Sequence, residues 1–169
     1  MSGNYLLRGL AVFLLCGCSP WVIGLSPKNP PIQVNADSPI FPKVASLQPT
    51  LQWESFSEHK QRAPNEKIDK NKVGAVTYEL KIWKLKQGYP IRWSAAQRNV
   101  EPGALIYSRK ALPQPRHIVE EPLEPSTKYI WTSRARYQYN GTERLTEWGQ
   151  QFVRPLVWVS YFGFRTPSQ

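Results

Sequence analysis

Three segments of this chain alternate between apolar and polar residues, and this alternation constrains the fold more than any other feature of the sequence. Residues 76–82 read Val-Thr-Tyr-Glu-Leu-Lys-Ile, and residues 129–137 place Tyr, Trp, Ser, Ala and Tyr at every second position. Residues 49–54 show a shorter version, with Leu51 and Trp53 on one face. Successive side chains of a β-strand point to opposite faces, so each segment is expected to be a strand with one buried and one solvated face.

Shorter segments with strand-forming composition raise the expected number of strands to seven. Prolines and polar loops separate them, and no amphipathic helix or internal repeat is evident. This pattern predicts an all-β fold, an antiparallel sandwich of two sheets. The shorter candidates are residues 41–46, 104–109, 116–119 and 161–166.

The first residues have the features of an export signal. Arg8 precedes an apolar run over residues 9–15, which is too short for a transmembrane helix of about 20 residues. Residues 15–18, Leu15-Cys16-Gly17-Cys18, resemble the lipobox of bacterial lipoproteins. The resemblance implies that residues 1–17 are a signal peptide and that Cys18 carries the lipid that anchors the protein to a membrane. An ordinary cleaved signal peptide is the alternative.

The lipobox resemblance also indicates where the protein is located and how its chain is divided. Ser19 is not the aspartate that marks inner-membrane retention in some bacteria, so we expect the bacterial cell envelope, and the outer membrane rather than the inner. Residues 18–39 are rich in Pro, Ser and Asn and are expected to be a flexible tether to a domain over residues 40–169. Both cysteines lie at the processing site, so no disulfide is expected.

The charge of the chain narrows the expected partners. Lys and Arg number 22 against 12 Asp and Glu, which gives a formal net charge of +10. Such a balance favours anionic neighbours, such as an envelope surface or an acidic partner protein. The basic residues are interspersed with acidic ones, whereas a nucleic-acid-binding arm is an unbroken basic block, so nucleic acid is not an expected partner.

The segment Leu123-Glu-Pro-Ser-Thr-Lys-Tyr129 resembles the tyrosine corner of fibronectin type III domains, with Leu123, Pro125 and Tyr129 at the matching positions. The resemblance implies a structural role, in which the Tyr129 ring packs at the end of the core and its hydroxyl bonds to backbone upstream. Further segments resemble strands of that family in order: residues 49–53 strand B, residues 78–83 strand C, residues 129–135 strand F and residues 164–167 the last strand. The resemblance implies a seven-stranded immunoglobulin-like sandwich.

Two segments depart from the family pattern. The expected B–C loop, residues 55–74, is long and polar, and loops of that length are often functional. Residues 150–160 form a hydrophobic insertion before the last strand. We expect Phe152, Leu156 and Trp158 of this insertion to contact a protein partner. The alternative is that the insertion covers an open sheet edge or extends the last strand.

Two motifs near the end of the chain have structural interpretations. Asn140-Gly141 predicts a hairpin turn, because both residue types tolerate positive φ. The fibronectin resemblance implies that Trp148 is sandwiched between cationic side chains, with Arg134 and Arg136 as the expected partners.

No residue pattern predicts catalysis. After the signal peptide the chain has two histidines, His59 and His117, and no cysteine-containing metal motif or phosphate-binding loop. The acidic cluster Glu120, Glu121 and Glu124 is interpreted as a solvated turn. We therefore expect no enzyme activity, metal or cofactor.

The resulting hypothesis is a non-enzymatic envelope lipoprotein that serves as an interaction or scaffold module, for example as a subunit of an envelope or secretion assembly. The partners are then a membrane, through the lipid, and an envelope protein; the sequence leaves the oligomeric state open. The alternative is a glycan-binding lipoprotein that stacks sugars on Trp83 and Trp93, since exposed aromatic faces bind sugar rings.

Overall fold

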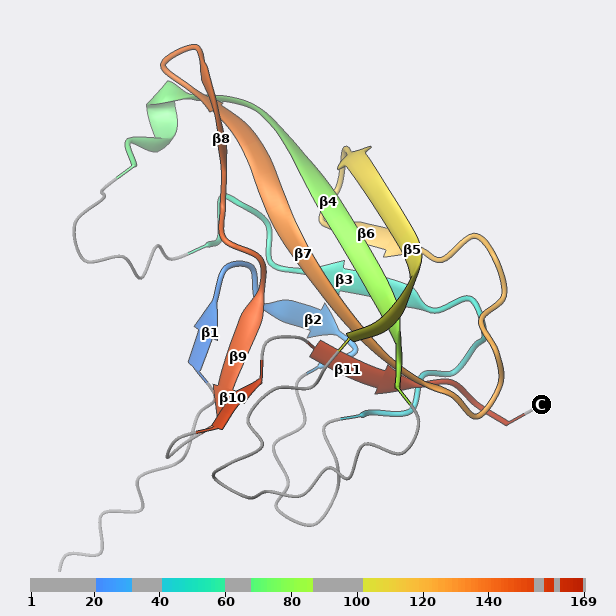
Figure 1. Cartoon of the computed structure of the whole chain (residues 1–169). Coiled ribbons are helices and arrows are strands. Elements are labelled where there is room, and N and C mark those ends of the chain that lie inside the picture. The colour runs from blue at the N-terminus through green and yellow to red at the C-terminus, as the bar shows by residue number, and fades with distance from the viewer. Residues whose placement is uncertain are drawn as a thin grey trace, which may run out of the picture.

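The computed structural model describes residues 21–31, 41–59, 68–86, 102–153, 157–159 and 162–168. In these residues the chain forms an immunoglobulin-like sandwich of two antiparallel sheets, as the sequence predicts (Figure 1). The helical structure of the described part is a 3-10 turn, η1, at Lys70–Lys72.

The larger sheet has the strand order β11-β7-β4-β5, and β8 also pairs with β7. Its long members β4 and β7 cross the whole molecule side by side in Figure 1. The smaller sheet has the order β2-β3-β6. The bounds of the larger sheet are β4 Val73–Leu85, β5 Pro102–Leu112, β7 Lys128–Tyr139, β8 Thr142–Leu145 and β11 Phe162–Arg165; those of the smaller are β2 Pro27–Asn29, β3 Thr50–Trp53 and β6 Arg116–Ile118.

The core lies between these sheets and consists largely of aromatic rings. Trp53 of β3 contacts both Tyr78 of β4 and Trp131 of β7, with ring centroids 5.9 and 6.2 Å apart. Leu51, Leu80 and Ile82 are fully buried beside them, together with Tyr129 and Phe164. The alternation of residues 49–54, 76–82 and 129–137 therefore predicted the inward faces correctly.

Three successive chain segments lie along one edge of strand β7, and together they form what we call the composite edge of the larger sheet. β8 pairs with the end of β7, through Asn140-Gly141, whose φ angles of 51° and 77° form the expected hairpin turn. The backbone then continues along the same edge, where Gly149 donates to the carbonyl of Ser133, and β11 completes the edge from Phe162. The described residues between Gly149 and Phe162, namely 150–153 and 157–159, leave this edge and pair elsewhere.

The hydrophobic insertion forms a hairpin of β9 (Gln150–Val153) and β10 (Val157–Val159), and β9 pairs with β1 (Trp21–Ile23). These three strands make a small third sheet beside the sandwich (Figure 1). The insertion therefore pairs with the N-terminal segment of the described chain, and does not extend the last strand.

The expectation of a flexible tether over residues 18–39 needs correction for residues 21–31. β1 and β2 lie in this range, β2 pairs with β3, and Leu25 between them is fully buried in the core. Backbone pairing and the burial of one leucine thus order a segment that its Pro and Asn content suggests is irregular.

Two other strand expectations differ from the structure. Residues 41–46 form no strand; Lys43 makes an isolated bridge to Arg165. β4 begins at Val73, so the expected B–C loop of residues 55–74 ends earlier. The first residues of this loop pack on the core. The ring centroids of Phe56 and Tyr137 lie 4.3 Å apart, and the backbone N–H of Phe56 donates to the Tyr78 hydroxyl. Residues 60–67 of the loop lie outside the described chain.

Candidate functional site

Several residues singled out in the sequence lie outside the described residues, namely Cys18, Trp93 and Leu156. For Phe152 and Trp158 the backbone is placed, and these two residues are paired partners in the β9–β10 hairpin. Phe152 is also the partner of Trp21 in β1, so the insertion and the N-terminal segment meet at an aromatic row.

The tyrosine corner has the expected local geometry. The backbone N–H of Glu124 donates to the Tyr129 hydroxyl at 3.0 Å, and the Tyr129 ring stacks on Phe164 with 5.5 Å between centroids. Leu123 is buried in the core cluster, whereas Pro125 is exposed at the turn. These contacts fix the end of the core, so this segment is structural.

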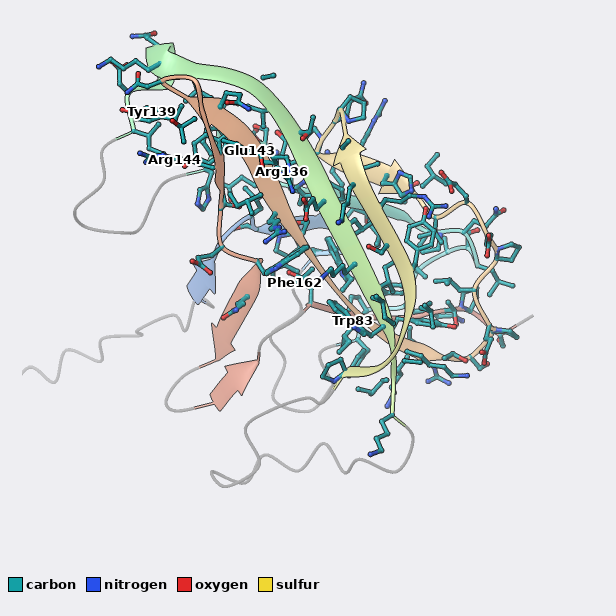
Figure 2. All side chains as sticks on the ribbon, turned by 45° about the horizontal axis from the view of Figure 1, so that its top comes forward. Trp83, Arg136, Tyr139, Glu143, Arg144 and Phe162 are labelled. Atoms are coloured by element: carbon teal, nitrogen blue, oxygen red, sulfur yellow. The ribbon has the colours of Figure 1, made fainter. Side chains whose placement is uncertain are left out.

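The outer face of the larger sheet carries a row of cationic side chains around Trp148. Arg134 Cζ lies 4.2 Å and Lys81 Nζ lies 4.7 Å from the centre of the Trp148 ring. The expected partner Arg134 is present, but Lys81 of β4 occupies the place expected of Arg136. Arg136 pairs with Glu79 and Glu143 instead (Figure 2).

Glu79 is the buried centre of this face, with 1% of its surface exposed. It is the direct partner of Arg134 in the β4–β7 register, accepts from the Arg134 Nε at 2.9 Å and is clamped by Arg136 at 2.6 Å. Burial raises the pKa of Glu79, but the hydrogen bonds from Arg136 and Arg134 outweigh it and hold that pKa below its ordinary value. The carboxylate is a structural anion rather than a proton donor.

Trp83, expected as a sugar platform in the alternative function, lies half-buried near the end of β4, well away from Arg136 and Glu143 (Figure 2). Its neighbours in the register are Leu105 of β5 and Ile130 of β7, and Ile130 is buried. Trp83 therefore stands in an apolar row of the sheet.

The two histidines have separate surroundings. The His117 Nε2 bonds to the Tyr107 hydroxyl, and burial lowers the pKa of His117 and raises that of Tyr107, so both groups are neutral near pH 7. His59 Nδ1 lies 3.7 Å from a carboxylate oxygen of Glu54. The described residues contain no group of three or more His, Cys, Asp or Glu that could hold a metal ion.

The acidic turn is also engaged in pairs. Glu120 binds Arg109 and Glu124 binds Lys84, and all four side chains are at the surface. Surface ion pairs of this kind are screened by solvent and contribute little to stability, and here they link the turn to β4 and β5.

Among the described residues, three of the four large apolar side chains that are exposed lie on the last strands of the two sheets, a feature that the sequence analysis did not identify. Leu105 and Ile106 of β5 are 51% and 40% exposed, and Ile118 of β6 is 60% exposed. β5 is the last strand of the larger sheet and β6 the last strand of the smaller. The Tyr107–His117 contact joins these two strands, and Arg109 of β5 also binds Glu120, which follows β6. We call Leu105, Ile106 and Ile118 the edge patch.

Compared with known proteins, the chain matches no protein-family model, no curated protein and no solved structure. Among the described residues, no helix is long and apolar enough to cross a membrane.

Proposed function

We propose that this chain is a non-enzymatic lipoprotein of the bacterial cell envelope, held to a membrane by a lipid on Cys18, whose sandwich binds an envelope protein. The anchor is supported by the lipobox-like Leu15-Cys16-Gly17-Cys18 after a short apolar run. The absence of a disulfide or metal motif in the sequence leaves the sandwich stabilised by its aromatic core. Its strand order and the Tyr129–Glu124 hydrogen bond support a domain of the fibronectin type III class.

The edge patch is the main observation that supports binding to a protein partner. Its three large aliphatic side chains come from two edge strands, β5 and β6, which also carry the exposed Lys110 and Arg116. Exposed aliphatic side chains on strands that also carry charged ones are typical of a protein-binding surface. The net charge of +10 favours a partner whose contact surface is acidic at the rim.

The partner role is tested by site-specific photo-crosslinking in cells. A photo-reactive amino acid replaces Ile118 or Leu105 in one experiment and Leu145 in the matched control, since Leu145 of β8 is 42% exposed and lies on another strand edge. We expect one protein to be crosslinked from positions 118 and 105 and not from 145. Equal labelling from all three positions would contradict the proposed surface.

The anchor is tested independently by mass spectrometry of the mature N-terminus. The expected product begins at Cys18 and carries acyl chains, and a Cys18→Ser chain is neither acylated nor cut before residue 18. An unmodified cysteine in the exported protein would overturn the anchor and leave the test of the edge patch unaffected.

A further inference from the structure

The two sheets of the sandwich are joined at their β5–β6 edge by a contact between Tyr107 and His117. Tyr107 is opposite the buried Ile82 in the β4–β5 register, and His117 is opposite the buried Leu51 in the β3–β6 register. Directly opposite residues of paired strands share a face, so both rings lie on the inner faces of their sheets. Their centroids are 5.7 Å apart, and the Tyr107 hydroxyl is hydrogen-bonded to His117 Nε2. This hydrogen bond therefore spans the space between the sheets.

The contact depends on the protonation state of the imidazole. Burial raises the pKa of the Tyr107 hydroxyl, so this group keeps its proton and is the donor. The His117 Nε2 can accept this hydrogen bond only while the ring is neutral, because a protonated imidazole carries hydrogen on both nitrogens. A proton on His117 therefore removes the acceptor of the Tyr107 hydroxyl.

The surroundings of His117 disfavour that proton. Among the described residues, β5 contributes Tyr107 and Arg109, the segment after β6 contributes Glu120, and β3 contributes the apolar Leu51. Burial lowers the pKa of His117, Glu120 raises it and Arg109 lowers it, and the result lies below the ordinary value of 6.5. Because the folded pKa is lowered, the contact is favoured above about pH 6.5 and becomes weaker as the pH falls through the folded pKa.

The edge patch is built on the residues next to this contact. Ile106 immediately precedes Tyr107, and Ile118 immediately follows His117. Successive side chains of a strand point to opposite faces, so Ile106 and Ile118 are exposed where their neighbours turn inward. The Tyr107–His117 contact thus fixes the spacing of the exposed aliphatic side chains on β5 and β6.

We infer that His117 is a pH switch of the edge patch: protonation of its ring releases Tyr107, separates β5 from β6 and weakens binding of the partner protein. This inference rests on the proposed function of the edge patch. Binding belongs to neutral pH and release to mild acid. Glu58, Glu79 and Glu120 have pKa values below 4.5, so these carboxylates stay ionised while His117 titrates.

The switch is tested on the free mature chain, residues 18–169 with Cys18→Ser, by amide hydrogen exchange at about pH 7.5 and 5.5, corrected for intrinsic rates. Protection of the β5 and β6 amides should fall severalfold at the lower pH, and by no more than about tenfold, because an exposed histidine with a pKa of 6.5 is protonated about tenfold over neutral there. In His117→Phe, which keeps an aromatic ring without a titrating group, this protection should be the same at both pH values. The matched control His59→Gln removes the other histidine of the mature chain and should retain the full pH dependence.

NMR of the imidazole guards against a folding defect in the variants. In the unsubstituted domain, nitrogen chemical shifts should show His117 Nε2 without hydrogen at about pH 7.5. Tyr107→Phe should bring the pKa of His117 closer to 6.5, because the neutral ring loses its hydrogen bond. Edge protection that does not change with pH, or that changes equally in His117→Phe, overturns the switch, as does a hydrogen on Nε2 at neutral pH.

Photo-crosslinking from position 105 in isolated cell envelopes connects the switch to binding. We expect the yield of crosslinked partner to fall severalfold between about pH 7.5 and 5.5, and to stay equal in His117→Phe. An unchanged yield, together with pH-dependent exchange, overturns the coupling of the switch to binding. If no partner is crosslinked at either pH, the proposed function fails, whereas the exchange data still decide for or against the opening of the edge.

Discussion

The indole ring of Trp148 lies against the guanidinium of Arg134, with 4.2 Å between the ring centre and the Arg134 Cζ atom. This contact joins the composite edge of the larger sheet to β7, and Lys81 of β4 reaches the same ring. One aromatic ring therefore connects three neighbouring segments of the sheet through their cationic side chains.

The first prediction concerns this ring. Lys81→Met should lower the free energy of unfolding by about 0.5–1 kcal/mol, because the ammonium loses its contact with the indole. In a Trp148→Leu background the same Lys81→Met change should have almost no effect. Urea unfolding of the four proteins of this cycle measures the coupling, and an equal cost of Lys81→Met in both backgrounds would show that the ring contact does not stabilise the fold.

The second prediction concerns the buried carboxylate. Glu79→Gln keeps the size of the side chain but leaves Arg134 and Arg136 without their shared anion, so we expect a loss of about 3–5 kcal/mol in the free energy of unfolding. The matched control is Glu143→Gln, which removes an exposed partner of the same Arg136 and should cost less than about 1 kcal/mol. Similar costs for the two variants in chemical denaturation would refute the role of burial.

The third prediction is a pH dependence. The hydrogen bonds from Lys28, and then those from the backbone and hydroxyl of Ser55, lower the pKa of Glu58 from 4.5 to about 2. Since the folded pKa lies below the ordinary value, this carboxylate stabilises the fold above about pH 4.5, and the contribution is lost as the pH falls toward 2. Lys28→Met should raise the pKa of Glu58 but leave it below 4.5, because Ser55 still donates. NMR titration of the Glu58 carboxyl carbon measures this pKa. An unchanged pKa in the Lys28→Met variant would contradict Lys28 as the main cause of the shift.

The fourth prediction concerns the tyrosine corner. Tyr129→Phe removes the acceptor of the Glu124 N–H, so we expect a loss of about 1–3 kcal/mol in the free energy of unfolding. Tyr139→Phe, at the other end of β7, is the control, since that ring is half-exposed beside Arg144 and its change should be small. Thermal unfolding followed by circular dichroism compares the two, and the expected order of melting temperatures is Tyr129→Phe below Tyr139→Phe.

The fifth prediction tests how the N-terminal segment is held. Gly24 and Gly141 both have positive φ, but a Cβ atom on Gly141 meets nothing within 4 Å, whereas one on Gly24 meets the backbone of Glu147 and Trp148. Gly141→Ala should therefore cost about 1–2 kcal/mol from backbone strain alone. Gly24→Ala should cost more, and should also speed amide hydrogen exchange in β1 and β9. Equal costs would mean that residues 21–31 are not locked to residues 147–149.

The sequence predicts the centre of the sandwich well. Alternation in residues 76–82 and 129–137 places Tyr78, Leu80 and Trp131 inward because a strand between core and solvent must keep one apolar face. The Asn140-Gly141 turn is equally local, since two residues that tolerate positive φ define it.

The features that the sequence does not reveal depend on contacts between distant segments. β1 and β2 have three residues each, too few for a recognisable period, and their order comes from pairing with β9 and β3. The burial of Glu79 likewise depends on register, because Arg134 faces it only when β4 and β7 pair as they do. The edge patch is missed for the same reason: Ile118 looks like a core residue until β6 is known to be an edge strand.

The order of attachments along residues 21–29 also determines how the domain responds to tension on its N-terminal end. Force applied before Trp21 acts first on the three paired residues of β1, which are held to the hairpin by a few backbone hydrogen bonds. The next resistance is Leu25, which must leave the core, followed by the β2–β3 pairing. We therefore expect β1 to separate from β9 at low force while the sandwich stays folded. The loss of this short pairing would protect the domain from unfolding under weak tension.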